Sequence, residues 1–279
     1  MIAICPNPYR DNNLSYTREC LQLLKTAGYD CCVCPVFTDE TWTAPADIRT
    51  ERLKDVSSAL SHILVLGGDG TVLAVVRQLR SLSVPILSVN LGTKGFMTAL
   101  EPNDLHDITR LLQKDAPVSV RMMLELSLIR GGLAIVNERA LNDAVIHGYG
   151  ECIQPTAWAD GEKMFSFSGD GLIVATPTGS TGYSMSAGGP IVEPEAQAIL
   201  LTPICAHTLS AKPFVLSTRK KIRVLTEKLT GRRAYLAVDG YQVADLESGD
   251  ILEIGLSDQT IHMIQPMCRS FFDQLEKLV

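Results

Sequence analysis

A short apolar run that leads into a glycine cluster constrains this chain more than any other stretch. The run is Ile63-Leu64-Val65-Leu66-Gly67-Gly68-Asp69-Gly70-Thr71. Residues 63–66 predict a buried strand, because consecutive apolar residues leave no polar face. Apolar residues then recur at helical spacing, which predicts a helix over 71–81. Asp69 should therefore lie just beyond a strand and beside a helix N-terminus, where open α/β sheets bind ligands and backbone N–H groups attract phosphate.

Asp69 has two interpretations at that place. Asp is common as a turn residue and as a helix cap, so the position needs no chemical role. Alternatively, its carboxylate lies near phosphates and acts as a general base or as a magnesium ligand. The strand, glycine and helix pattern alone does not separate these interpretations.

Strands and helices are predicted to alternate over residues 1–117. Strands are expected at 1–5, 30–36, 63–66 and 85–89, and helices at 15–27, before 60, at 71–81 and after Pro102. This alternation favours a parallel, doubly wound, Rossmann-like α/β domain. The strand at 85–89 ends in a second glycine-containing loop, 90–96, which parallel pairing would place beside Asp69.

The periodicity changes near Pro117. From 118 to 264 the alternation typical of strands predominates, and Gly131-Gly132 is a hairpin signal. We therefore predict a second, β-rich domain over 118–264. The remaining residues, 265–279, contain an expected terminal helix over 269–278.

Charge and composition exclude several classes of protein. The formal net charge of -6 argues against a general nucleic-acid binder, although an acidic protein can still bind an anionic ligand locally. No run approaches the roughly 18 apolar residues that span a bilayer, and residues 1–5 resemble a strand more than a signal peptide. The eight cysteines lack paired C-x-x-C spacing, so we expect reduced, packed thiols. A cytoplasmic protein that binds neither nucleic acid nor membrane is expected.

The segment 170–190 carries the densest polar signal. A predicted strand, 171–175, leads into a loop rich in glycine and hydroxyl groups and then into an expected helix. Such a surface suits a ligand with hydroxyl or phosphate groups, although a turn followed by a capped helix explains the same residues. The hydroxyls come from Thr178, Ser180, Thr181, Ser184 and Ser186.

Asn142 and Asp143 stand together inside an apolar strand pattern. Burying two adjacent polar side chains is costly unless they are hydrogen-bonded. We interpret them either as a turn at a strand edge or as a hydrogen-bonding pair for a ribose or a base.

Together these stretches resemble the NAD kinase family over nearly the whole chain. The resemblance rests on the turn at 67–71, on 90–92 with Gly95-Phe96, on 141–143, on 170–190 and on 204–210. Diacylglycerol, sphingosine and phosphofructokinase relatives use a similar glycine–Asp turn. The segment 170–190 in combination with 141–143 is far more specific.

The resemblance implies that the protein transfers the terminal phosphoryl group of ATP, or of polyphosphate, to the 2′-hydroxyl of the adenosine ribose of NAD, which gives NADP. Such transfer depends mainly on positioning and charge neutralisation. Magnesium or another divalent metal would be carried with ATP, without a cage of protein ligands. The family further implies a homodimer or homotetramer, and a terminal helix that returns to the N-terminal domain.

The resemblance also implies roles for individual residues. Asp69 is the expected general base that takes the 2′-hydroxyl proton. Gly67, Gly68 and Thr71 are expected to contact phosphate, and Tyr183 is a candidate to stack on a base. The residues expected to bind NAD or ATP are Asp69, Gly70, Phe96, Asn142, Asp143, Asp170, Thr178, Thr181, Gly182, Tyr183, Ser184, Met185, Ser186 and Gln242.

This chain departs from the family pattern in two places. Many relatives carry Gln directly after Asp-Gly or Asp-Ser, whereas here Tyr241 precedes Gln242, so either residue could take that position. Some relatives carry Lys or Arg where this chain has Ser168. Two other functions are alternatives. A lipid or sugar kinase could share the glycine–Asp turn, but such an enzyme does not call for segment 170–190. A non-catalytic NAD-binding regulator does not need Asp69.

Overall fold

The chain divides into two compact units, Met1–Val120 with Ile261–Val279, and Arg121–Thr260. The computed structural model describes residues 1–39, 41–79, 83–92, 95–113, 115–208, 210–226, 229, 231–266 and 271–276. Within these residues no helix is both long and apolar enough to cross a membrane.

The first unit is built on a parallel sheet, as the sequence predicts. Its strands follow the order β2-β1-β3-β4, and each neighbouring pair is parallel. The end of β16 extends the sheet, because Met263 pairs in parallel with Ile86. The strands of this sheet are β1 (Ile2–Pro6), β2 (Cys31–Val33), β3 (His62–Gly67), β4 (Ile86–Asn90) and β16 (Ile251–Ile264).

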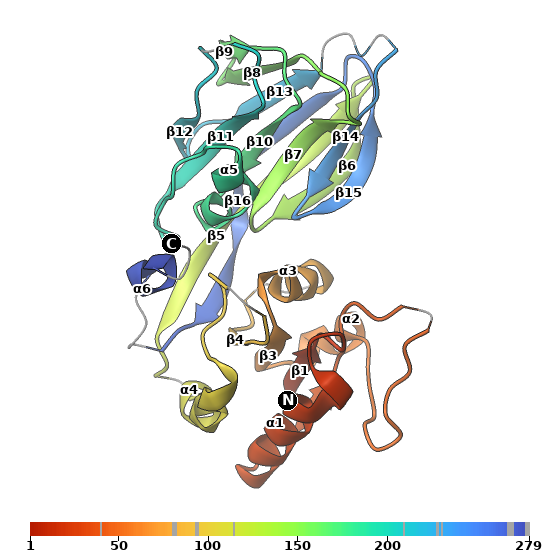
Figure 1. Cartoon of the computed structure of the whole chain (residues 1–279), viewed down its shortest axis with the longest axis vertical. Coiled ribbons are helices and arrows are strands. Elements are labelled where there is room, and N and C mark those ends of the chain that lie inside the picture. The colour runs from red at the N-terminus through yellow and green to blue at the C-terminus, as the bar shows by residue number, and fades with distance from the viewer. Residues whose placement is uncertain are drawn as a thin grey trace. The chain divides into compact units, whose positions relative to one another are not determined.

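Helices cover both faces of the parallel sheet (Figure 1). The helix α1 (Ser15–Thr26) and the pair η3 (Pro102–Asp107) and α4 (Ile108–Leu111) bury apolar side chains against β1, β3 and β4. The opposite face carries α3 (Asp69–Gln78), whose valines are buried. The remaining helical segments are η1 (Asn12–Leu14), α2 (Leu53–Val56), η2 (Ser57–Ala59) and α6 (Phe271–Glu276).

Several predicted helices are shorter in the structure. The helix expected before residue 60 is one turn of α-helix followed by a 3-10 turn, and the helix expected after Pro102 is mostly 3-10. The helix predicted at 71–81 begins earlier, at Asp69, and its expected end at 80–81 lies outside the described residues. Of the terminal helix predicted at 269–278, the described residues show Phe271–Glu276.

The second unit contains two antiparallel sheets, which confirms its predicted β-rich character. One has six strands in the order β12-β11-β10-β7-β14-β15, namely β12 (Phe214–Ser217), β11 (Ala198–Ile204), β10 (Gly171–Ala175), β7 (Asp143–Gly148), β14 (Ala234–Val238) and β15 (Tyr241–Leu246). The sequence analysis did not anticipate β11. In the second sheet, β16 pairs with β13 on one side and with β5 on the other; β8 and then β9 follow β13, and β6 follows β5. These strands are β5 (Val118–Arg130), β6 (Leu133–Ala140), β8 (Pro155–Ala159), β9 (Glu162–Ser166) and β13 (Ile222–Thr226).

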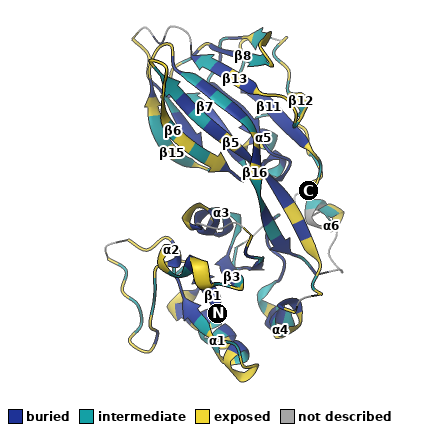
Figure 2. Ribbon diagram, turned by 180° about the vertical axis from the view of Figure 1, so that it is seen from behind, coloured by how far each residue is buried: buried dark blue, intermediate teal, exposed yellow. Residues whose placement is uncertain are grey.

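The two sheets of this unit bury one apolar core between them (Figure 2). Alternate residues of every main strand contribute, because successive side chains of a strand point to opposite faces. Leu124 and Leu126 of β5 meet this core, as do Ile146 of β7 and Leu236 of β14. On the other face of the six-stranded sheet, the described residues form a small apolar cluster around Val145, Ile173 and Leu200.

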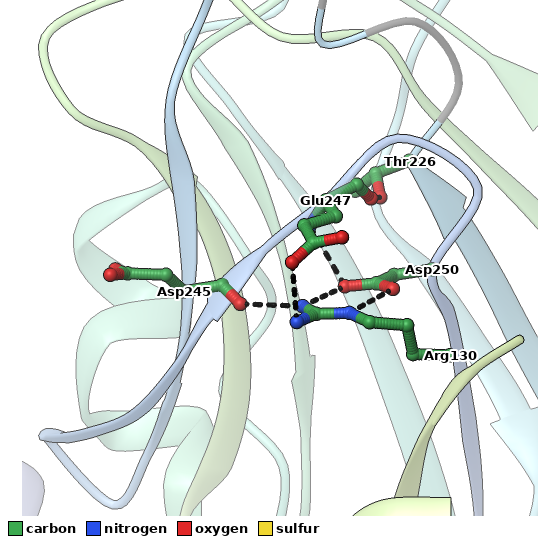
Figure 3. Close-up of polar contacts among 5 residues, drawn as sticks. All are labelled: Arg130, Thr226, Asp245, Glu247 and Asp250. Carbon is green, nitrogen blue, oxygen red and sulfur yellow. Dashed lines mark hydrogen bonds and ion pairs between the residues drawn. The ribbon is translucent and has the colours of Figure 1, made fainter. Parts of the chain in front are cut away.

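The β5–β6 hairpin turns at Gly131-Gly132, as predicted, with φ of +58° and +83°. Arg130, at the end of β5, then reaches the turn between β15 and β16 (Figure 3). Its guanidinium donates two hydrogen bonds to the Asp250 carboxylate, at 2.9 and 2.7 Å, and one to Glu247 at 2.7 Å. Since the Asp250 side chain is only 2% exposed, Arg130 supplies the cation that compensates its burial.

We expect Arg130→Ala to lower the free energy of unfolding by about 2–3 kcal/mol, because it leaves the buried Asp250 carboxylate without its cation. Arg223→Ala is the matched control, since Arg223 and Glu253 are both well exposed and such pairs contribute below about 1 kcal/mol. Urea titrations of the two variants measure the difference. Equal losses of unfolding free energy in the two variants would show that burial of the Asp250 carboxylate does not depend on Arg130.

Candidate functional site

Asp69 lies where the parallel sheet reverses its strand order. The connection from β1 leads to β2 on one side, and the chain then crosses to β3 on the other side of β1. Ligands of open α/β sheets bind beyond the carboxyl ends of the strands at such a point. Asp69 is separated from the end of β3 by Gly68 alone and is the first residue of α3.

The carboxylate of Asp69 holds the loop that follows β4. Its Oδ2 accepts a hydrogen bond from the N–H of Phe96 at 2.9 Å, and its Oδ1 accepts one from Met97 at 3.0 Å. The predicted proximity of this loop to Asp69 is therefore confirmed. Glycine at position 95 permits this close approach, because a Cβ there would lie 3.1 Å from Asp69 Oδ1 and 2.4 Å from Thr98 Oγ1. Thr93 and Lys94 of the same loop lie outside the described residues.

The glycines of the turn fall into two kinds. A Cβ on Gly67 would come within 2.2 Å of Thr71 Oγ1, so Gly67 and the buried Thr71 pack against each other. The N–H of Thr71 also donates to the carbonyl of Gly68 at 2.8 Å, which closes the first turn of α3. Thr71 thus has a structural contact, and its expected contact with phosphate stays a prediction. Gly68 and Gly70, by contrast, face open space.

In the second unit, several predicted residues share the face of the six-stranded sheet that points away from the main core. Opposite residues of paired strands share a face, and His147 pairs with Tyr235 while Ala237 pairs with Gln242. Asp143 lies on this face four residues from His147 in β7. Tyr241 pairs with Val238, which belongs to the main core, so Gln242 and not Tyr241 lies on the face of Asp143.

Asn142 and Asp143 belong to the loop 141–143, whose last residue is also the first residue of β7. This loop is hydrogen-bonded on two sides. The Asp239 carboxylate accepts hydrogen bonds from the N–H groups of Leu141, Asn142 and Asp143 at 2.9, 2.7 and 3.1 Å. Thr176, just beyond β10, donates its hydroxyl to the Leu141 carbonyl and its N–H to the Asn142 carbonyl. Asp239 was not among the predicted site residues, although its Asp-Gly pair is a hairpin-turn signal in the sequence.

Two buried polar atoms here have no hydrogen-bond partner among the described residues: Asn142 Oδ1 and Thr178 Oγ1. Leaving such an atom unsatisfied costs about 1–3 kcal/mol. The segments that carry them are in contact, since a Cβ on Gly179 would lie 2.2 Å from the Asn142 carbonyl oxygen. These atoms mark a place where a ligand can supply the missing donors.

The predicted ligand-binding segment folds as two short turns, η4 (Thr178–Thr181) and α5 (Tyr183–Ser186), in place of a longer helix. Ser184 is fully buried, and its hydroxyl shares a hydrogen bond of 2.8 Å with that of Thr202, which holds the segment in place. Its expected contact with a ligand stays a prediction. Thr181 donates its hydroxyl to the Thr178 carbonyl. The remaining members lie at least partly at the surface, namely Gly182, Tyr183, Met185 and Ser186.

Tyr183 lies close to two predicted carboxylates. Burial of its ring, followed by the charges of Tyr235, Cys205, Asp170 and Asp143, raises the pKa of its hydroxyl. Asp170 also accepts a hydrogen bond from the Cys205 thiol, which raises the pKa of that thiol. Tyr183 therefore lies within range of the charges of both Asp143 and Asp170.

Gln242 has an exposed side chain whose amide is already hydrogen-bonded. It donates to the hydroxyl of Tyr149 and to Asp245 Oδ1. Tyr149 packs on Tyr235 with ring centroids 4.8 Å apart, and Tyr235 stacks on His147 at 5.7 Å. Gln242 thus belongs to an aromatic group on the same sheet face, which the sequence analysis did not identify.

A separate pocket of about 1150 Å³ lies in the second unit, among β5, β6, β8, β13 and β16. Glu125, Trp158 and Arg223 are among its lining residues, and no predicted site residue lines it.

Asp143 is a carboxyl with a strongly raised pKa. Burial, and then the neighbouring charge of Asp239, raises the pKa of Asp143 from 3.8 to about 7. The folded protein therefore binds this proton more tightly than the unfolded chain does. Between about pH 4 and about pH 7, unfolding therefore releases this proton. The contribution of Asp143 to the free energy of unfolding falls as the pH rises through that range.

We expect Asp143→Asn to stabilise the ligand-free protein at pH 8 but not at pH 4, by roughly 2 kcal/mol, because the amide never carries the buried charge. Urea unfolding of wild type and variant across this pH range measures the effect. Asp258→Asn, at an exposed position of the same unit, is the control and should show no such trend. A difference between wild type and Asp143→Asn that does not change with pH would contradict the raised pKa.

Comparisons with known proteins agree across both halves of the chain. The family model described as the ATP-NAD kinase N-terminal domain matches residues 2–116, and the ATP-NAD kinase C-terminal domain matches residues 141–266. An NAD kinase of Acetivibrio thermocellus is 34% identical over 277 residues, which cover 98% of this chain and 95% of that protein.

Solved structures give the same result. A yeast NADH kinase complexed with NADH is 26% identical, with a TM-score of 0.86 over 99% of this chain and 85% of that chain. An NAD kinase from Archaeoglobus fulgidus in complex with ATP is 25% identical, with a TM-score of 0.76 over 100% of this chain and 98% of that chain. With both family models matched along one chain, this protein belongs to the NAD kinase family.

Proposed function

We propose that this protein is an NAD kinase that transfers the terminal phosphoryl group of ATP to the 2′-hydroxyl of the adenosine ribose of NAD, giving NADP. The observation that carries the proposal is the match of both family models, which together span residues 2–116 and 141–266. A lipid or sugar kinase that shares only the glycine–Asp turn would not match the second half. A non-catalytic regulator would have no use for the carboxylate of Asp69 as a base.

Asp69 is the proposed general base. A ribose hydroxyl is a poor nucleophile until a base removes its proton. The N–H groups of Phe96 and Met97 fix the carboxylate of Asp69 in place, one on each oxygen. The open space at Gly68 and Gly70 supports their proposed approach to phosphate.

The second unit is proposed to bind NAD. Asn142 Oδ1 and Thr178 Oγ1 are buried atoms that lack partners, which supports their contact with the nucleoside. Asp143 follows Asn142 directly, and Gln242 lies on the same sheet face as Asp143. Tyr183 is influenced by the charges of both Asp143 and Asp170. The partly exposed members of 181–186 complete the set, and Phe96 of the first unit is the proposed aromatic contact to adenine.

Magnesium, or another divalent metal, is proposed to enter with ATP. No group of three or more His, Cys, Asp or Glu side chains that could hold a metal occurs in the described part of the chain. Mg²⁺ keeps several waters and is commonly held by one or two carboxylates and by substrate phosphates. When bound, the metal would neutralise charge on the phosphates.

Further features of the family are proposed for this chain. They are an α/β domain over 1–117 that carries the glycine–Asp turn, a β-rich NAD-binding domain over 118–264, and a terminal segment, 265–279, that returns to the first domain. A homodimer or homotetramer and a cytoplasmic location also remain proposals.

We expect Asp69→Asn to lower turnover by at least about a hundredfold, because the amide cannot act as a base. NAD binding, measured by calorimetry, should stay near that of wild type. NADP is detected with an NADP-specific dehydrogenase after incubation with NAD, ATP and magnesium. Asp55→Asn, an exposed position of the same unit, should retain full activity. Near-normal turnover by Asp69→Asn would remove Asp69 from its proposed role.

The same assay with polyphosphate in place of ATP tests the donor. We expect ATP to support NADP formation. Formation with polyphosphate alone would keep the reaction and change the donor, whereas no product with either donor would contradict the proposed function.

A further inference from the structure

Asp239 occupies the tight turn between β14 and β15. Its φ is +48° and that of Gly240 is +82°, so both turn residues adopt the left-handed conformation. Asp and Asn tolerate this conformation better than most side chains because they are short and polar. The turn therefore admits Asp at this position, but the turn geometry alone would admit Asn or Gly equally well.

The carboxylate of Asp239 is used outside its own turn. Three successive N–H groups, those of Leu141, Asn142 and Asp143, converge on its two oxygens. In return, the N–H of Asp239 donates to the Asp143 carbonyl at 2.9 Å. Successive N–H groups that point to one place form an anion-binding concavity. Here the anion is a side chain of the same protein.

These bonds hold the chain where β7 begins: its first residue, Asp143, pairs with Ala175 of β10. The pairing of β7 with β14 ends at Ala144 and Val238, just after the loop 141–143. On its other side the loop is bonded by Thr176 and packs against Gly179. Asn142 is thus fixed from two sides, and its unpartnered Oδ1 is held in a defined position.

We propose that Asp239 is a positioning residue for NAD binding, which holds loop 141–143 so that Asn142 and Asp143 are preorganised for the ligand. This inference rests on the proposed NAD kinase function. Asp239 acts through the loop and is not assigned a contact with the substrate. Charge-assisted hydrogen bonds to a carboxylate are stronger than neutral ones, which explains why Asp serves where Asn would fit the turn.

Steady-state kinetics of Asp239→Ala test the proposal, with NAD varied at saturating ATP and magnesium. Loss of the preorganised loop should raise KM for NAD at least about tenfold, while kcat and KM for ATP change less than about threefold. Asp239→Asn retains one acceptor oxygen and the turn conformation, so its KM for NAD should fall between those of Asp239→Ala and wild type. If Asp239→Ala does not fold, Asp239→Asn is the deciding variant. The proposal then requires a raised KM for NAD while kcat changes less than about threefold.

The matched control is Arg130→Ala, which is expected to destabilise the same unit away from the loop 141–143. It should leave KM for NAD within about twofold of wild type. An equal rise of KM in Arg130→Ala and Asp239→Ala would show that general destabilisation explains both, and would overturn the proposal.

The pH dependence of KM for NAD gives a readout that a purely structural role would not move. The titratable groups that the described residues place against Asp143 are Asp239, from the β14–β15 turn, and Tyr183, from α5. Removal of the Asp239 charge lowers the pKa of Asp143, so the corresponding midpoint should move to lower pH in Asp239→Asn. An unmoved midpoint together with an unchanged KM would overturn the proposal, whereas a wild type that forms no NADP would overturn the proposed function itself.

Discussion

Carboxylates that bind backbone N–H groups of a neighbouring loop organise both parts of the candidate site. In the first unit Asp69 accepts hydrogen bonds from Phe96 and Met97. In the second unit Asp239 accepts three from the loop 141–143. Loops beyond the ends of strands lack the hydrogen bonds of the sheet, so a fixed carboxylate defines their conformation. Such bonds are stronger than those between neutral groups.

The two carboxylates serve the proposed reaction differently. Asp69 combines a structural contact with a proposed chemical role, that of the general base. Asp239 is proposed to act only through the loop that it holds. Asp143, buried beside Asp239, has a raised pKa because burial and a like charge both disfavour its ionised form. The position of a carboxylate, more than its presence, decides what it can do.

The sequence predicted much of the fold because the apolar periodicity is strong where strands are buried. The parallel strands around Asp69 and the hairpin at Gly131-Gly132 were predicted correctly. Helix lengths were overestimated, and β11 was missed. The segments concerned owe their conformation to packing against the sheets, which local periodicity does not encode.

For the site, the sequence by itself determined which residue types are available: a carboxylate after a glycine pair, an Asn-Asp pair and a run of hydroxyls. The tertiary structure alone decided how they are used. It buries Ser184 and Thr71 in packing contacts, leaves Asn142 Oδ1 and Thr178 Oγ1 without partners, and brings Asp239 to a loop almost a hundred residues earlier in the chain. Strand pairing creates these contacts between distant residues, so no local pattern could reveal them.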